Sequence, residues 1–276
     1  MHKLTFLFHA IGDQVCTTAI PENIYNVTGK KCVITDKRIW AFKYNPYVVF
    51  MEENEARGLN EIVIMPDARI PEQIKAHENI MKSVVYNSQT EYMCVNMNFN
   101  DVRLRHPRLY IYEDVKRFPN RIVVHTSGSD RTVDGEAPFR ANHGEDSVRI
   151  MSDEVIASIL KNYDEDTYEV IQVGGKTDKP LGGHSKDFRG LDIWETAEII
   201  ATGSRFIGIN SGCMHIANCY PGIDKRIVLQ EFHSAAIQTF KPGDTRSWLM
   251  SWFDPTSTFF NKYNVDVGVS YSHTKI

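Results

Sequence analysis

The sequence lacks the features that mark several large protein classes. No uninterrupted apolar run among its 276 residues approaches the roughly 20 residues that a membrane-spanning helix requires. Its five cysteines are scattered and form no CxxC pair, which argues against a disulfide framework and against a zinc knuckle. The hydrophobic share of 42% and the charged share of 24% exclude a disordered, collagen-like or coiled-coil chain. A globular protein with reduced thiols is predicted.

There is also no excess of positive charge. The formal net charge of −4 excludes a global positive field that would attract nucleic acid. The charge is unevenly divided, because residues 1–121 carry 16 basic and 14 acidic side chains whereas the rest carry 15 and 21. At roughly 150 residues per domain, the length fits two domains, and we predict domains 1–121 and 122–276.

A secretory leader is not expected either. The first residues, MHKLTFLFHAIGD, contain one lysine, a short apolar run and no small-x-small cleavage site before Asp13. We therefore expect a first strand at 3–9 and a cytoplasmic location.

Apolar and polar residues alternate in a pattern typical of α/β folds. In the first half, strands are predicted at 3–9, 31–35 and 61–65, with a helical stretch at 17–27. In the second half, strands are predicted at 121–125, 169–173, 206–209 and 226–229, and helices at 152–163 and 193–202, with Ser152 as an N-cap. Strands separated by helices at this spacing indicate two parallel sheets.

Two turns that follow predicted strands stand out, because ligands of open parallel sheets bind beyond the carboxyl ends of strands. The first turn, HAIGDQVCTT, contains Gly12 and the carboxylate of Asp13. The second, GINSGCMHIA, would present the amides of Gly212, Cys213 and Met214 at the start of a helix, as an anion site. Taken alone, each residue has an alternative interpretation, Asp13 as an ordinary turn residue and Ser211 as an ordinary helix cap.

These residues resemble a known family. Gly12-Asp13, the hydroxyls after the strand that ends near His125, and the SGxMHxA motif that begins at Ser211 resemble the ADP-heptose heptosyltransferases, which are GT-B glycosyltransferases. The resemblance covers most of the chain. It implies two Rossmann-like domains with parallel sheets that face each other across a cleft. The first would hold the acceptor and the second a nucleotide-sugar donor.

The same resemblance assigns roles to individual residues. It makes Asp13 the catalytic base, beside Gly12 on the acceptor side. Asn210 stands where the family commonly has an acidic residue. For the donor, the resemblance implies contacts by Thr126, Ser127, Arg149, Ser211, Gly212, Met214 and His215. Together with Arg131, Asn210 and Cys213, these are the predicted donor-binding residues.

The chemistry of sugar transfer agrees with these roles. A carboxylate takes the proton from the acceptor hydroxyl, and positive groups stabilise the departing diphosphate. Asp13 can do the first, and the helix start at Gly212 with Arg131 or Arg149 the second. No metal or cofactor is then required, and inversion at the sugar follows from the resemblance. The acidic run 164–166 is interpreted as solvated, and His125 as a hydrogen-bonded structural histidine.

A basic segment suggests where an acceptor would bind. Arg103, Arg105 and Arg108 form an electropositive run that fits an anionic acceptor such as a phosphorylated glycan, or alternatively a nucleic-acid backbone or a solvated rim. Other interpretations of the whole chain stay open at this point. They are a glycosyltransferase acting on a hydroxylated DNA base, a nucleotide-sugar epimerase or hydrolase, and a non-catalytic nucleotide-binding module.

Overall fold

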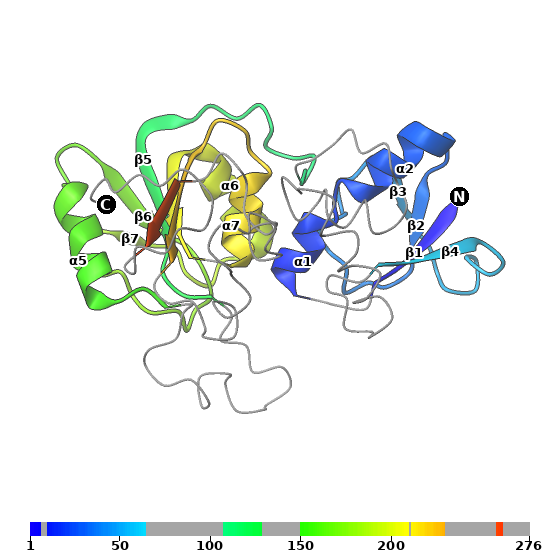
Figure 1. The fold of residues 1–276 in the computed structure, drawn as a ribbon, viewed down its shortest axis with the longest axis horizontal. Coiled ribbons are helices and arrows are strands. Elements are labelled where there is room, and N and C mark those ends of the chain that lie inside the picture. Colours follow the sequence, from blue (N-terminus) through cyan, green and yellow to red (C-terminus); the bar gives the residue numbers. More distant parts are fainter. Residues whose placement is uncertain (7–9, 65–106, 129–149, 210, 230–257, 262–276) are drawn as a thin grey trace, which may run out of the picture. The chain divides into compact units, whose positions relative to one another are not determined.

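The computed structural model describes residues 1–6, 10–64, 107–128, 150–209, 211–229 and 258–261 (Figure 1). The chain divides into two compact units, of which Met1–Ile111 forms the main part of the first and Tyr112–Asp244 the main part of the second. The boundary predicted at residue 121 falls inside a strand of the second unit, β5 (Phe118–His125). Each unit is described by itself below.

The first unit contains a parallel sheet in the order β3-β2-β1-β4. Its described elements are β1 (His2–Phe6), α1 (Ile11–Cys16), α2 (Ile20–Thr28), β2 (Cys32–Ile34), β3 (Val48–Phe50) and β4 (Asn60–Ile64). β1 is the first strand of the chain and lies inside the sheet, with β2 on one side and β4 on the other. The predicted strands are thus present, and the short strand β3 is an addition.

The predicted helix at 17–27 is observed as α2, which begins later, at Ile20, and follows a separate short helix, α1, that was not predicted. Thr17 and Thr18 donate their hydroxyls to the backbone oxygens of Gln14 and Val15, at 2.8 and 2.7 Å, where α1 ends. Such side-chain bonds compete with helix continuation. Pro21 lies in the first turn of α2, where its missing N–H costs nothing. The chain therefore ends one helix and starts another.

The second unit contains a parallel sheet in the order β10-β9-β8-β5-β6-β7. After β5, its described elements are α5 (Asp153–Asn162), β6 (Glu169–Gln172), β7 (Lys186–Asp187), α6 (Ile193–Thr202), β8 (Gly203–Gly208), α7 (Gly212–Asn218), β9 (Asp224–Leu229) and β10 (Thr258–Asn261). The predicted helix 193–202 is confirmed residue for residue. The edge strands β7 and β10 were not predicted.

The core of this unit follows the two-residue period of β5. Ile122 and Val124 point to one face, where they pack with Ile156 and Ile159 of α5. α6 and α7 cover the opposite face (Figure 1). The alternation continues into the next residues, so His125 belongs to the face of α7 and Thr126 to the face of α5.

Strand order identifies one special place in each sheet. β5 is followed along the chain by β6 on one side, and the chain later returns on the other side as β8. In the same way β1 lies between β2 and β4. Open parallel sheets bind ligands outside the carboxyl ends of strands at such switch points.

The predicted α/β class with two Rossmann-like parallel sheets is therefore confirmed. Within the described ranges, no helix is long and apolar enough to cross a membrane.

Candidate functional site at the strand switch points

The switch point of the second sheet is lined with polar side chains. His125 is the last residue of β5, and its register partner on β8 is Gly208. Thr126 and Ser127 follow β5, while Ser211 stands between β8 and the first turn of α7. The sheet thus brings together two chain segments that the sequence analysis had singled out separately.

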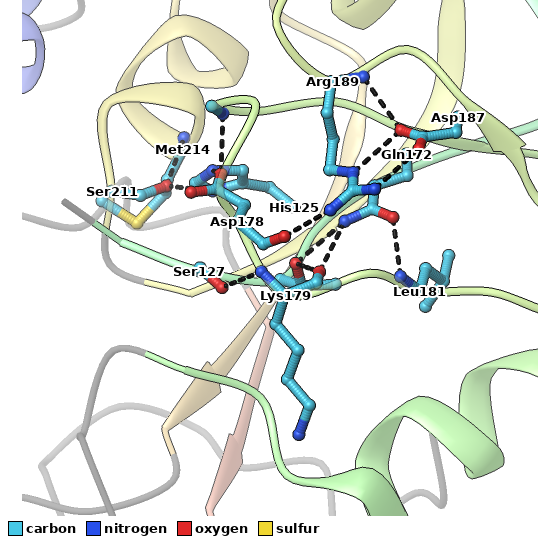
Figure 2. Close-up of polar contacts among 12 residues, drawn as sticks. His125, Ser127, Gln172, Asp178, Lys179, Leu181, Asp187, Arg189, Ser211 and Met214 are labelled. Atoms are coloured by element: carbon cyan, nitrogen blue, oxygen red, sulfur yellow. Dashed lines mark hydrogen bonds and ion pairs between the residues drawn. The ribbon is translucent and has the colours of Figure 1, made fainter. Parts of the chain in front are cut away.

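His125 is the centre of a buried polar cluster (Figure 2). Its Nδ1 lies 2.8 Å from Ser211 Oγ, and its Nε2 lies 3.0 Å from Asp178 Oδ2. The relative exposures of His125, Ser211 and Asp178 are 4%, 2% and 6%. As expected, the imidazole has partners on both nitrogens, but one of them is a carboxylate that the sequence analysis missed.

The backbone around Asp178 holds its carboxylate in place. The amide of Gly175 donates to Asp178 Oδ2 at 2.8 Å. Arg189 donates to the backbone oxygen of Asp178 and forms an ion pair with Asp187 at 2.7 Å. Gly174 has a φ of +133°, and a Cβ there would lie 2.2 Å from Asp178 Oδ2. Only glycine therefore fits beside the cluster at this position.

The surroundings of His125 change its protonation. Burial by itself lowers its pKa, but the adjacent Cys213 sulfur and the Asp178 carboxylate outweigh burial and raise the pKa of His125 to about 10. The imidazole is therefore protonated at neutral pH, and both ring nitrogens donate.

Thr126 and Ser127 face the loop after β6. Thr126 Oγ1 donates to the backbone oxygen of Lys179 at 2.5 Å and accepts from Gln172 Nε2 at 3.0 Å. Ser127 Oγ accepts from the Lys179 amide at 2.9 Å. Since the single proton of Thr126 is already donated, this hydroxyl is left only as an acceptor. The prediction that both residues contact a diphosphate stays a prediction.

The start of α7 agrees with the predicted helix cap. Ser211 Oγ accepts from the amide of Met214 at 3.3 Å. Gly212 is partly exposed, whereas the side chains of Cys213, Met214 and His215 are buried. The backbone at Gly212 is therefore the most accessible part of these four residues. Asn210, Arg131 and Arg149 lie outside the described residues.

The corresponding place in the first unit belongs to Asp13. This residue, with Gly12, lies in the first turn of α1, just beyond the carboxyl end of β1, and both are partly exposed. Thr17 Oγ1 donates to the backbone oxygen of Asp13 at 3.2 Å. The two turns predicted to be functional thus each occupy the switch point of a sheet.

Arg108 has structural partners within the first unit. Its Nη1 lies 3.5 Å from Glu22 Oε2, and its guanidinium lies over the ring of Tyr110, 4.9 Å from the centroid. Its amide donates to Thr18 Oγ1 at 3.0 Å. Its predicted role in acceptor binding stays a prediction, and Arg103 and Arg105 lie outside the described residues.

No metal site is indicated in the part of the chain that the structure describes. No group of three or more His, Cys, Asp or Glu side chains is placed there to hold an ion. The acidic run 164–166 is exposed between α5 and β6.

The sequence analysis missed Asp178, Gln172 and Lys179 as members of the polar network. A weak signal was present for Asp178, because it follows the two glycines that end a predicted strand. Glycines at the end of a strand allow another group to approach the backbone closely, so an acidic residue shortly after them is a candidate for the site.

Comparison with solved structures identifies the fold. A glycosyl transferase family 9 protein from Veillonella parvula DSM 2008 matches with a TM-score of 0.61 at 12% sequence identity, over 95% of this chain and 86% of that one. The dodecameric iron-containing heptosyltransferase TibC, in complex with ADP-D-beta-D-heptose, matches with a TM-score of 0.58 at 15% identity, over 99% and 67%. E. coli ADP-heptose LPS heptosyltransferase II matches with a TM-score of 0.54 at 11% identity, over 94% and 90%.

The fold is GT-B-like. No protein-family model and no curated protein sequence matches the chain. The GT-B-like fold is therefore carried by a sequence that shares only 11–15% identity with the structures compared. This agrees with the resemblance inferred from the two turns.

Proposed function

We propose that this protein is a glycosyltransferase that moves a sugar from a nucleoside-diphosphate sugar to a hydroxyl of a glycan. The observation that carries the proposal is the position of the two predicted turns at the switch points of two parallel sheets, in a chain whose fold matches solved heptosyltransferases. Switch points are where such sheets bind ligands.

The donor diphosphate is assigned to the second unit. Ser211 and the partly exposed backbone at Gly212 lie beyond β8, and Ser127 lies beyond the neighbouring strand β5. Main-chain amides and hydroxyls next to a protonated imidazole favour a dianionic group. The TibC structure supports a nucleoside-diphosphate sugar as donor by analogy, since that heptosyltransferase was solved with ADP-D-beta-D-heptose.

The acceptor hydroxyl is assigned to Asp13. A carboxylate at the end of β1 is suited to accept the proton of an attacking hydroxyl as the bond to the diphosphate breaks. We propose direct displacement, which inverts the configuration at the sugar carbon, and departure of the diphosphate without a metal ion.

Nucleotide binding is the first test. Thermal unfolding would be followed with ADP, GDP, UDP and CDP, because a ligand at 100 times its dissociation constant adds about 2.7 kcal/mol to the free energy of unfolding. We expect one diphosphate to raise the melting temperature clearly more than the others. Absence of any shift with all four at millimolar concentration would contradict a nucleotide-sugar donor.

Turnover is the second test. The nucleotide-sugar that carries the preferred base would be incubated with and without phosphorylated oligosaccharides, and in parallel with duplex DNA containing a hydroxylated base. We expect diphosphate release that depends on the glycan, gives an inverted product and is unchanged by EDTA. Release without any acceptor would instead indicate a hydrolase, and binding without release a non-catalytic module.

A further inference from the structure

The hydroxyl of Ser211 has a restricted set of hydrogen-bond options. A serine oxygen has two lone pairs and one hydrogen. One lone pair accepts the amide of Met214 at 3.3 Å, and His125 Nδ1 lies 2.8 Å away. What the hydroxyl hydrogen does therefore depends on whether His125 Nδ1 carries a proton.

Asp178 decides where the imidazole keeps its protons. Its Oδ2 accepts from the Gly175 amide and faces His125 Nε2 at 3.0 Å. An ionised carboxylate only accepts, so Nε2 keeps its hydrogen in both the charged and the neutral imidazole. Loss of a proton from His125 therefore takes place at Nδ1, the nitrogen that faces Ser211.

The two protonation states then orient Ser211 in opposite ways. When Nδ1 carries a proton, it donates to Ser211 Oγ, both lone pairs of that oxygen are used, and its hydrogen points away from the imidazole. When Nδ1 is unprotonated, it accepts the hydroxyl hydrogen, which is then turned toward His125. When Nδ1 carries a proton, no acceptor for the Ser211 hydroxyl hydrogen is found among the described residues.

We propose that His125 is a positioning residue for the donor diphosphate, which it serves by donating to Ser211 so that the Ser211 hydroxyl hydrogen is free to bind a phosphate oxygen. This inference rests on the proposed function, because it concerns the same diphosphate site beyond β5 and β8. The inference gives a role to two residues beyond the proposed contacts. His125 acts on the ligand through Ser211 without touching it, and Asp178 sets the tautomer of the imidazole.

Two neighbouring side chains favour the protonated form of His125. They are Asp178 in the loop after β6 and Cys213 on α7, and together they raise the pKa of His125 to about 10 against the effect of burial. Arg189 acts on the same loop through the backbone oxygen of Asp178. The donating state is thus the one present at neutral pH.

A double-mutant cycle tests whether His125 acts through Ser211. The dissociation constant of ADP, or of whichever of the four diphosphates binds best, would be measured by calorimetry for wild type, His125→Gln, Ser211→Ala and the double variant. A hydrogen bond to a charged group contributes about 1.5–3 kcal/mol, so Ser211→Ala should weaken binding about tenfold or more. His125→Gln should cost a similar factor, and the double variant no more than Ser211→Ala alone.

Two further measurements separate positioning from a structural role. Between about pH 7.5 and about pH 10 the charge of the diphosphate is constant, since its last pKa lies near 6. The affinity of the wild type for the diphosphate should fall over this range. The affinity of Ser211→Ala, measured at the same pH values, should fall less. Asp178→Asn should fold and should move the fall in affinity to lower pH. Ser211→Thr, which keeps the hydroxyl, should bind the diphosphate within about threefold of wild type.

His184→Gln is the matched control. His184 Nε2 donates to the backbone oxygen of Tyr163 at 2.7 Å in the same unit, and its replacement should leave affinity unchanged. Additive losses in the double-mutant cycle, or identical pH profiles of wild type and Ser211→Ala, would overturn the inference while leaving the proposed function intact. If wild type binds none of the four diphosphates, the proposed function itself fails.

Discussion

At the scale of single residues, the site depends on a backbone that leaves no room for ordinary side chains. Asp178 reaches His125 only because Gly174 has no Cβ. The carboxylate then receives the Gly175 amide and the imidazole at once. A buried charge is tolerated when such partners surround it.

Replacing Gly174 tests this dependence. Gly174→Ala adds a Cβ that would meet Asp178 Oδ2 and His125 Cδ2 at 2.2 and 2.6 Å, at a φ of +133° that alanine rarely adopts. Gly29→Ala is the control, because Gly29 also has a positive φ but nothing lies within 4 Å of its added Cβ. The control should cost about 1–2 kcal/mol of unfolding free energy. Gly174→Ala should cost at least about 1 kcal/mol more in urea unfolding.

The protonation of His125 predicts a pH dependence of stability. Because the folded pKa is raised above the ordinary value of 6.5 to about 10, the protonated imidazole stabilises the fold fully below about pH 6.5. This contribution is lost progressively as the pH rises through about 10. The difference in unfolding free energy between wild type and His125→Gln should therefore shrink from neutral to alkaline pH. A constant difference would contradict a raised pKa, and His184→Gln controls for removal of a histidine.

At the scale of elements, local caps determine where the helices that frame the second sheet begin. Asp192 Oδ1 accepts from the amides of Trp194 and Glu195, and Glu195 returns a bond to the Asp192 amide. This capping box explains why α6 begins at the predicted residue. Ser152 caps α5 in the same local manner.

The contribution of the capping box of α6 to stability can be measured by substitution. Asp192→Ala removes the acceptor and should lower the free energy of unfolding by about 1 kcal/mol. Asp192→Asn keeps an acceptor oxygen and should lose less. Chemical denaturation of both variants checks the order, and an equal loss in the two would mean that the cap itself contributes little.

At the scale of the whole molecule, the two candidate groups belong to different compact units. Asp13 lies in the first unit, while His125, Asp178 and Ser211 lie in the second. If the first unit handles the acceptor and the second the donor, substitutions should separate the two functions.

Asp13→Asn is the test of that division of labour. Loss of a general base should lower turnover by about 100-fold or more, whereas the affinity for the donor diphosphate should stay unchanged. Steady-state kinetics and calorimetry on the same preparation measure both. Turnover near the wild-type level would remove Asp13 from the chemistry, and a large loss of diphosphate affinity would contradict the assignment of the donor to the second unit.

The sequence by itself determined the types of most elements and the two turns. Helix 193–202 and the cap at Ser152 were predictable because periodicity and capping are local properties of the chain. β7 escaped prediction because it is only two exposed residues long. The helix predicted from residue 17 starts only at Ile20, because the hydroxyls that end α1 bond to the backbone. Only the tertiary structure brought His125 to Asp178, 53 residues away, and to Ser211, 86 residues away. Strand order and the alternation of β5 decide such contacts, and neither is written in any short stretch of sequence.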